Sequence, residues 1–70
     1  MNKQKFVGIM YENGDNQGKL AEAMDISLSR LNAKINGSGE FSQSEIQFIK
    51  DRYDLDADKV DEIFFTPHVS

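Results

Sequence analysis

Apolar residues recur along the chain at the three- and four-residue spacing of amphipathic helices rather than in the strict alternation of strands. In the first such stretch, Phe6, Ile9 and Met10 share one face. Asn2 precedes this stretch and is a suitable helix cap, and Asn13 is followed by a glycine that would end a helix. The pattern predicts a first helix that starts after Asn2 and ends at about Asn13.

Residues 17–37 contain two short helical patterns joined by a three-residue turn, Asp25 to Ser27. Asp15 or Asn16 is placed to cap the first helix and Ser27 the second, and the glycine that ends the stretch supplies a left-handed stop. The inward positions lie three or four apart and comprise Leu20, Ala21, Met24, Leu31 and Ile35. Two short helices around a tight turn are the layout of a helix-turn-helix, with an ordinary helical hairpin as the alternative.

Two further helices have clear starting points. Ser42 and Glu45 form the Ser-x-x-Glu pattern of a capping box, which predicts a fourth helix running to about Tyr53. Asp56 is placed to cap a fifth helix. A proline ends that helix, and residues 66–70 are expected to form a frayed tail.

The apolar faces of these five helices define a predicted core. Its members are Phe6, Ile9, Leu20, Ala21, Met24, Leu31, Ile35, Phe41, Ile46, Ile49, Val60 and Ile63. Phe48 is expected to widen the apolar stripe of the fourth helix. A core this small should leave Phe64, Phe65 or Val69 uncovered, and we expect the resulting apolar surface to support self-association.

Composition suits one small globular domain without covalent cross-links. The 70 residues are 39% hydrophobic and include no cysteine, which excludes a disulfide framework and a thiolate metal site. No sustained apolar run suggests a signal peptide or a membrane span, so we expect a cytoplasmic protein. The net charge of -4 is uneven: residues 1–39 carry five basic and four acidic side chains, and residues 40–70 carry three and eight.

Catalytic and metal-binding patterns are weak. Alternate aspartates from Asp54 to Asp58 resemble the opening of a calcium loop, but Lys59 stands where glycine is needed and Phe65 where a bidentate glutamate is needed. His68 is the single histidine and has no cysteine or second histidine to act with. The sequence therefore predicts no enzyme, no metal and no cofactor.

The helix-turn-helix stretch resembles the DNA-binding domain of the lambda-repressor and Cro class. The matching residues are Gln17, Leu20, Ala21, Ile26, Ser27, Ser29, Leu31, Lys34, Ile35, Asn36 and Gly37, with support from Phe41 and from Ile63 to Phe65. The chain as a whole is similar to small Cro-like proteins of phages from Gram-positive hosts, a group that includes modulator-of-repression proteins acting as anti-repressors. This resemblance implies an all-α, lambda-repressor-like domain of five short helices over residues 1–70, with the helix-turn-helix at about residues 16–37. Asp25 departs from the class, which usually has glycine there to accept a positive φ.

The resemblance also implies which residues meet the ligand. In the second helix of the helix-turn-helix, the side chains that point into the major groove would be Leu28, Ser29, Asn32, Ala33 and Asn36. Gln17 is placed to bond a phosphate, and charge contacts could come from Lys19, Arg30 and Lys34. Leu28 and Ala33 can touch a thymine methyl and Asn32 could pair with adenine, but the leading positions lack Gln or Arg.

Two functions remain open on this sequence. The first is a Cro-like transcription regulator that binds double-stranded operator DNA as a homodimer in a lysis-lysogeny switch. The second is an anti-repressor that binds and masks the DNA-reading face of a partner phage repressor. The acidic second half of the chain and the apolar leading residue Leu28 favour the second function. The DNA binding that the resemblance implies outweighs composition and favours the first, and a helical bundle with another partner is the remaining alternative.

Overall fold

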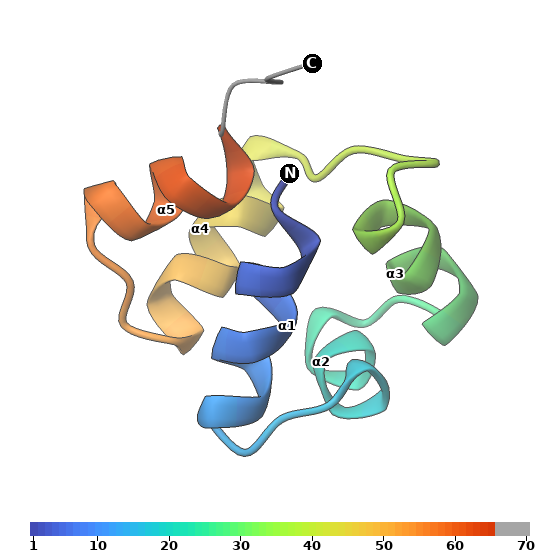
Figure 1. Cartoon of the computed structure of the whole chain (residues 1–70). Helices are drawn as coiled ribbons and strands as arrows, with labels where there is room; N and C mark the ends of the chain where they lie inside the picture. The colour runs from blue at the N-terminus through green and yellow to red at the C-terminus, as the bar shows by residue number, and fades with distance from the viewer. Residues whose placement is uncertain (66–70) are drawn as a thin grey trace.

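The computed structural model describes residues 1–65, and within them the chain forms five α-helices and no strand (Figure 1). Their order is α1 (Lys3–Glu12), α2 (Gln17–Met24), α3 (Leu28–Ile35), α4 (Gln43–Arg52) and α5 (Ala57–Phe64). No helix in this part of the chain is long and apolar enough to cross a membrane. The predicted all-α fold of five short helices is therefore confirmed.

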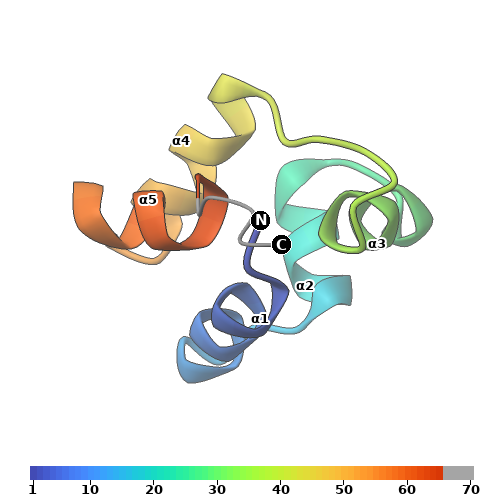
Figure 2. The same ribbon diagram turned by 45° about the horizontal axis from the view of Figure 1, so that its top comes forward.

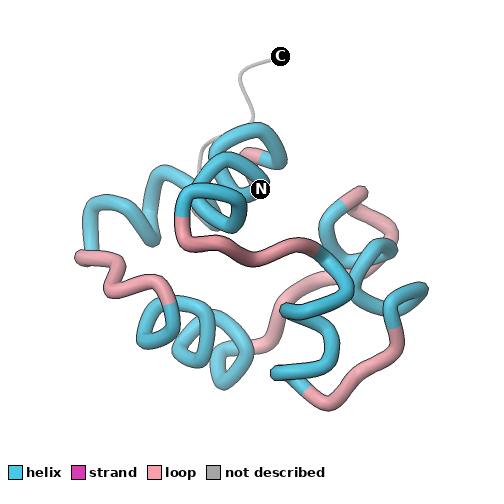
Figure 3. The backbone as a smooth tube through the Cα atoms, turned by 90° about the horizontal axis from the view of Figure 1, so that it is seen from below, coloured by secondary structure: helices cyan, strands magenta, loops and turns pink. Residues whose placement is uncertain are grey.

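Helix α1 lies between two pairs of helices, with α2 and α3 on one side and α4 and α5 on the other (Figures 1 and 2). Loops without other regular structure join the helices (Figure 3). The backbone N–H of Asn2 donates to the carbonyl of Ile63 over 2.6 Å. This bond holds the start of α1 against the end of α5.

Every helix begins at a polar side chain that accepts a hydrogen bond from a backbone N–H three residues further on. These caps are Asn2, Asn16, Ser27, Ser42 and Asp56. Each side-chain cap typically stabilises a helix by about 0.5 to 2 kcal/mol because it satisfies a donor that the helix itself leaves unpaired. At the start of α4 the capping box is complete, since the Ser42 backbone N–H also donates to the carboxylate of Glu45 over 2.8 Å.

The turn between α2 and α3 depends on one residue in the left-handed region. Asp25 has φ 58 and ψ 43, a conformation that Asp tolerates better than most residues other than glycine. The next backbone N–H, of Ile26, bonds the Ala21 carbonyl over 3.0 Å and so closes the end of α2. Beyond α3, Gly37 has φ 87 and stops that helix as expected.

The core lies where α1 meets the two helix pairs. Its buried apolar residues are Phe6, Met10, Leu20, Ala21, Leu31, Ile35, Ile49, Tyr53, Val60 and Ile63. Met10 and Tyr53 were expected on the inward faces of the first and fourth helices, and both are buried. Four residues that were predicted in the core are only half-buried, namely Ile9, Met24, Phe41 and Ile46. Phe48 is 37% exposed and does not widen the buried stripe, because it lies two residues from Ile46 and therefore roughly on the opposite side of α4.

Three aromatic rings close one end of the core. The centroids of Phe6, Phe41 and Phe64 lie 5.5 to 6.0 Å apart, two of the three pairs being edge-on. Phe64 is thereby half-buried, whereas Phe65 is 54% exposed, as expected for a core of this size. Val69 and the rest of the predicted tail, residues 66–70, lie outside the described residues.

Asp15 has a different role from the helix cap that the sequence suggested. Its carboxylate is 9% exposed and accepts hydrogen bonds from Arg52 at 2.7 and 3.0 Å and from the Tyr53 hydroxyl at 2.7 Å. The Arg52 guanidinium holds the pKa of Asp15 below its ordinary value despite burial. Burial and the bond to Asp15 raise the pKa of Tyr53, so the hydroxyl stays protonated and donates. The network ties the α1–α2 loop to the end of α4.

Candidate binding surface

One side of α3 faces the core and the other faces solvent. Leu31 and Ile35 are buried, while five outward side chains are exposed: Leu28, Ser29, Arg30, Asn32 and Asn36. Ala33 is half-buried between them. The residues that the resemblance assigns to ligand contact therefore share the solvent side of α3, and Leu28, at 54% exposure, is its largest apolar member.

A row of side-chain amides connects this side of α3 to two other helices. The Asn32 amide donates to the Gln17 side-chain oxygen over 3.0 Å. The Asn36 amide donates to the Asn32 side-chain oxygen over 2.6 Å, and the Lys3 ammonium donates to the Asn36 oxygen over 2.6 Å. The first residue of α2, Asn32 on α3, the C-cap Asn36 of α3 and the first residue of α1 thus form one connected row.

Lys3 was missed by sequence reasoning, which assigned it no role. Its partner Asn36 lies 33 residues further along the chain. No local spacing reports a contact between the start of α1 and the end of α3. The sequence shows two basic residues near the amino end, Lys3 and Lys5, but does not indicate which of them contacts the end of α3. In the structure Lys3 bonds Asn36 and Lys5 bonds Glu62.

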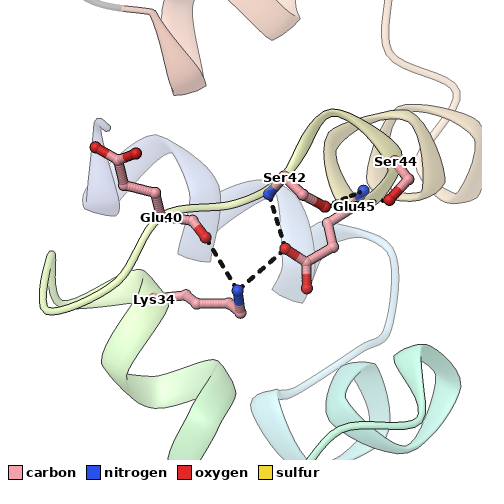
Figure 4. A network of polar contacts seen from close by, with 5 residues as sticks. All are labelled: Lys34, Glu40, Ser42, Ser44 and Glu45. Carbon is pink, nitrogen blue, oxygen red and sulfur yellow. Dashed lines mark hydrogen bonds and ion pairs between the residues drawn. The ribbon is translucent and has the colours of Figure 1, made fainter.

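Lys34 is directed away from the solvent side of α3 (Figure 4). Its ammonium donates to the Glu45 carboxylate over 3.1 Å and to the Glu40 backbone carbonyl over 3.0 Å, and it lies 5.8 Å from the centre of the Phe41 ring. The side chain is 11% exposed. These two bonds give Lys34 a structural role in holding the α3–α4 loop, and they leave one of its three N–H donors for any further contact.

The carboxylate that receives Lys34 belongs to the capping box of α4. Burial alone would raise the pKa of Glu45, but the Ser42 backbone N–H and the Lys34 ammonium together hold it below its ordinary value. One carboxylate therefore caps α4 and also fixes the loop between α3 and α4. This arrangement orients the end of α3.

The charge around α3 differs from that of the whole chain. Residues 26–39 contain two basic side chains and no acidic one. Arg30 and Lys19 are exposed and form no ion pair within residues 1–65, and Lys3 adds a third cation at the end of α3. Glu22 on α2 and Asp25 in the turn are also exposed, so α3 itself bears no acidic side chain while α2 and the turn beside it carry both signs of charge.

A groove with both polar and apolar walls lies beside this surface, between the α3–α4 loop and the end of α5. It has a volume of about 460 Å³, and its apolar lining comes from Met1, Phe41, Ile46, Phe64 and Phe65, with Glu40 among its polar residues. Lys34 borders it. The groove places the exposed ring of Phe65 next to the half-buried aromatic cluster.

Metal ligands do not gather in the part of the chain that the structure describes. Within residues 1–65 there is no group of three or more His, Cys, Asp or Glu side chains placed to hold an ion. His68 lies beyond these residues.

Comparison of the chain with models of known families, with curated proteins and with solved structures finds no match.

Proposed function

We propose that this protein is a Cro-like transcription regulator that binds operator DNA through α2, the Asp25 turn and α3, used as a helix-turn-helix. The observation that supports the proposal is the exposed side of α3, which apart from Leu28 is mostly polar, carries Arg30 and has no acidic residue of its own. A helix of this kind fits the major groove of B-DNA, where base edges present acceptors and thymine methyls. The protein would act by binding, without a cofactor, in the cytoplasm of a phage-infected bacterium.

Individual residues take distinct parts in this proposal. Gln17 and Arg30 would bond phosphate oxygens, which sets the position of the protein on the duplex. Ser29 and Ala33 would face the base edges, and Leu28 would contact a thymine methyl. Lys34 is omitted because Glu45 already holds it.

Self-association completes the proposal. Regulators of this class bind two half-sites as dimers, and of the exposed aromatic residues Tyr11, Phe48 and Phe65 the last lies next to the aromatic cluster. Phe65 is 54% exposed and lines the groove beside the aromatic cluster. We propose that the exposed surface at Phe65 joins two copies of the chain.

The alternative is an anti-repressor, and two observations favour it. Leu28 is 54% exposed on the same side of α3, where an apolar residue suits a protein interface. Acidic side chains gather in the second half of the chain, and Asp54, Asp58 and Asp61 are exposed and form no ion pair within residues 1–65. Such a surface would attract the basic DNA-reading face of a repressor.

Mobility shift on the DNA around the protein's own gene, with and without the neighbouring repressor, separates the two functions. If DNA is the ligand, Arg30→Ala weakens binding and lowers the salt slope by about one, because one phosphate contact is lost. Lys59→Ala is the matched control: it removes the same charge from α5, on the other side of the fold from α3. Leu28→Ala alters sequence preference more than affinity.

The opposite result supports the alternative. An absence of any shift at low salt, together with tight repressor binding that Leu28→Asp abolishes, would reject operator binding. Equal losses of DNA affinity in Arg30→Ala and Lys59→Ala would show that only net charge matters and would remove α3 from the proposal.

A further inference from the structure

In the row of side-chain amides at α3, the donor and the acceptor of every hydrogen bond are fixed. The ammonium of Lys3 has N–H donors and no acceptor, so Asn36 must turn its oxygen toward Lys3 and its amide N–H groups toward Asn32. Asn32 must then offer its oxygen to Asn36 and its N–H to Gln17. Gln17 is the last residue of the row and accepts through its side-chain oxygen. Its amide nitrogen takes part in none of these bonds.

We infer that Lys3 is a positioning residue of the binding surface, which orients the amides of Asn36, Asn32 and Gln17 so that Gln17 presents N–H donors to an anionic oxygen of the ligand. This inference rests on the proposed function. It adds a residue on α1 to the binding surface and a fixed orientation for the three side-chain amides. The ligand oxygen in question is that of a DNA phosphate. Without Lys3 each amide could turn over, and Gln17 could present its oxygen, which repels a phosphate.

The positive charge of Lys3 reinforces the row. Bonds in which the donor is ionised are about twice as strong as neutral ones, and each bond in a chain polarises the next. The two links nearest Lys3 are also the two shortest, at 2.6 Å each, while the far link measures 3.0 Å. Lys3 therefore fixes the two asparagines most firmly and Gln17 through them.

The row also fixes the orientation of the Asn32 amide. Pairing with adenine requires the asparagine oxygen to accept from the base and its nitrogen to donate to it. In this structure the Asn32 oxygen accepts from Asn36 and its nitrogen donates to Gln17. Each of these two atoms keeps a further N–H or lone pair, so the row fixes which way the Asn32 amide faces and leaves adenine pairing open to it.

The chain contains a matched control for Lys3. Lys5 lies on the same helix two residues away, has the same charge and bonds Glu62 on α5 over 3.2 Å instead of reaching α3. Lys3→Met and Lys5→Met therefore make the same change in net charge and nearly the same change in side-chain volume. Only the first removes the start of the row.

The first measurement needs no DNA. In ¹H–¹⁵N spectra, Lys3→Met should shift the side-chain amide signals of Asn36, Asn32 and Gln17, whereas Lys5→Met should leave them in place. Unchanged amide signals in Lys3→Met overturn the inference, whatever happens with DNA. Backbone signals that stay dispersed show that the variant is folded.

The second measurement is the affinity for a duplex taken from the DNA around the protein's own gene. Lys3→Met should weaken binding by about five- to tenfold, the loss expected for one ordinary hydrogen bond, and Lys5→Met by less than about twofold. In a Gln17→Ala background, Lys3→Met should have no further effect because the row then ends without its donor. An undiminished effect in that background would mean that Lys3 contacts DNA directly and would overturn the positioning role.

Failure of the proposed function gives a different pattern. If the amide signals shift in Lys3→Met but the wild-type protein binds no DNA at low salt, the row exists, while operator binding and the assignment of phosphate to Gln17 are both rejected. If the signals shift and both lysine variants weaken DNA binding equally, operator binding stands and the role of Lys3 is rejected.

Discussion

Asp15→Asn should destabilise the protein strongly, although Asp15 lies in a loop. The substitution preserves size but removes the charge that faces Arg52 and one of the two carboxylate oxygens that accept its bonds. It also leaves the Tyr53 hydroxyl, which is buried, with a weaker acceptor. The result is an unpaired guanidinium beside a buried hydroxyl at the junction of the α1–α2 loop and α4.

The magnitude follows from the exposure of the two partners. Breaking a fully buried ion pair by removing one member costs about 3 to 5 kcal/mol. The Asp15 side chain is 9% exposed but that of Arg52 is 34% exposed, so water can solvate the orphaned guanidinium in part. We expect a loss of about 2 to 3 kcal/mol, near the value for one or two charged hydrogen bonds. A domain of this length has roughly 3 to 10 kcal/mol in total, so the loss is a large share.

Thermal and urea unfolding at pH 7 measure this effect, and Asp54→Asn is the control. Asp54 is exposed, forms no ion pair within residues 1–65 and has φ 52, which asparagine adopts as readily. Its substitution should change stability by less than about 0.5 kcal/mol. The melting temperature of Asp15→Asn should fall by about 10 to 20 °C.

The same pair predicts how stability depends on pH. Because the folded pKa of Asp15 is lowered below 3.8, its carboxylate contributes stability above that pH and the contribution is lost as the pH falls toward the folded pKa. The difference between wild type and Asp15→Asn should be constant at neutral pH and shrink below about pH 4. A melting temperature within a few degrees of wild type at pH 7, or a difference that does not shrink in acid, would refute the reasoning.

Three further predictions concern the core, the backbone and the exposed surface at Phe65. Leu31→Ala should cost about 2 to 5 kcal/mol, since Leu31 is wholly buried, and an unchanged melting temperature would contradict the core assignment. Gly37→Ala should cost about 1 to 2 kcal/mol of stability because its φ of 87 strains a residue with a Cβ. Gly8→Ala, within α1 and with open space around it, should instead stabilise the protein by up to about 1 kcal/mol. Urea unfolding that ranks the two variants in the opposite order would disprove this. Phe65→Ser should weaken self-association in sedimentation, and a wild type that stays monomeric at high concentration would exclude that interface.

Local sequence patterns were sufficient for the helices. Asn2, Ser27, Ser42 and Asp56 cap the helices that they were predicted to cap, because a cap and its donor lie three residues apart and one short stretch contains both. The stop at Gly37 is equally local. The spacing of apolar residues found most of the core for the same reason.

Contacts between distant residues could not be read in this way. Asp15 and Arg52 are 37 residues apart, and Lys3 and Asn36 are 33 apart, so their pairing depends on how the helices pack. Lys34 shows the same limit within the candidate surface. Its place in the sequence of α3 suits a ligand contact, but α4 supplies a carboxylate that the helical pattern alone does not reveal.

The bond between Lys34 and Glu45 divides α3 into two sets of positions with different freedom to change. Position 34 is bound to the capping box of α4, so exchanging it would disturb two helices at once. Ser29 and Arg30 are exposed and make no side-chain bond within residues 1–65, so other residues can replace them without repacking the fold. A library randomised at these two positions should therefore yield mostly folded proteins, which makes this small domain a ready scaffold for altered binding preferences.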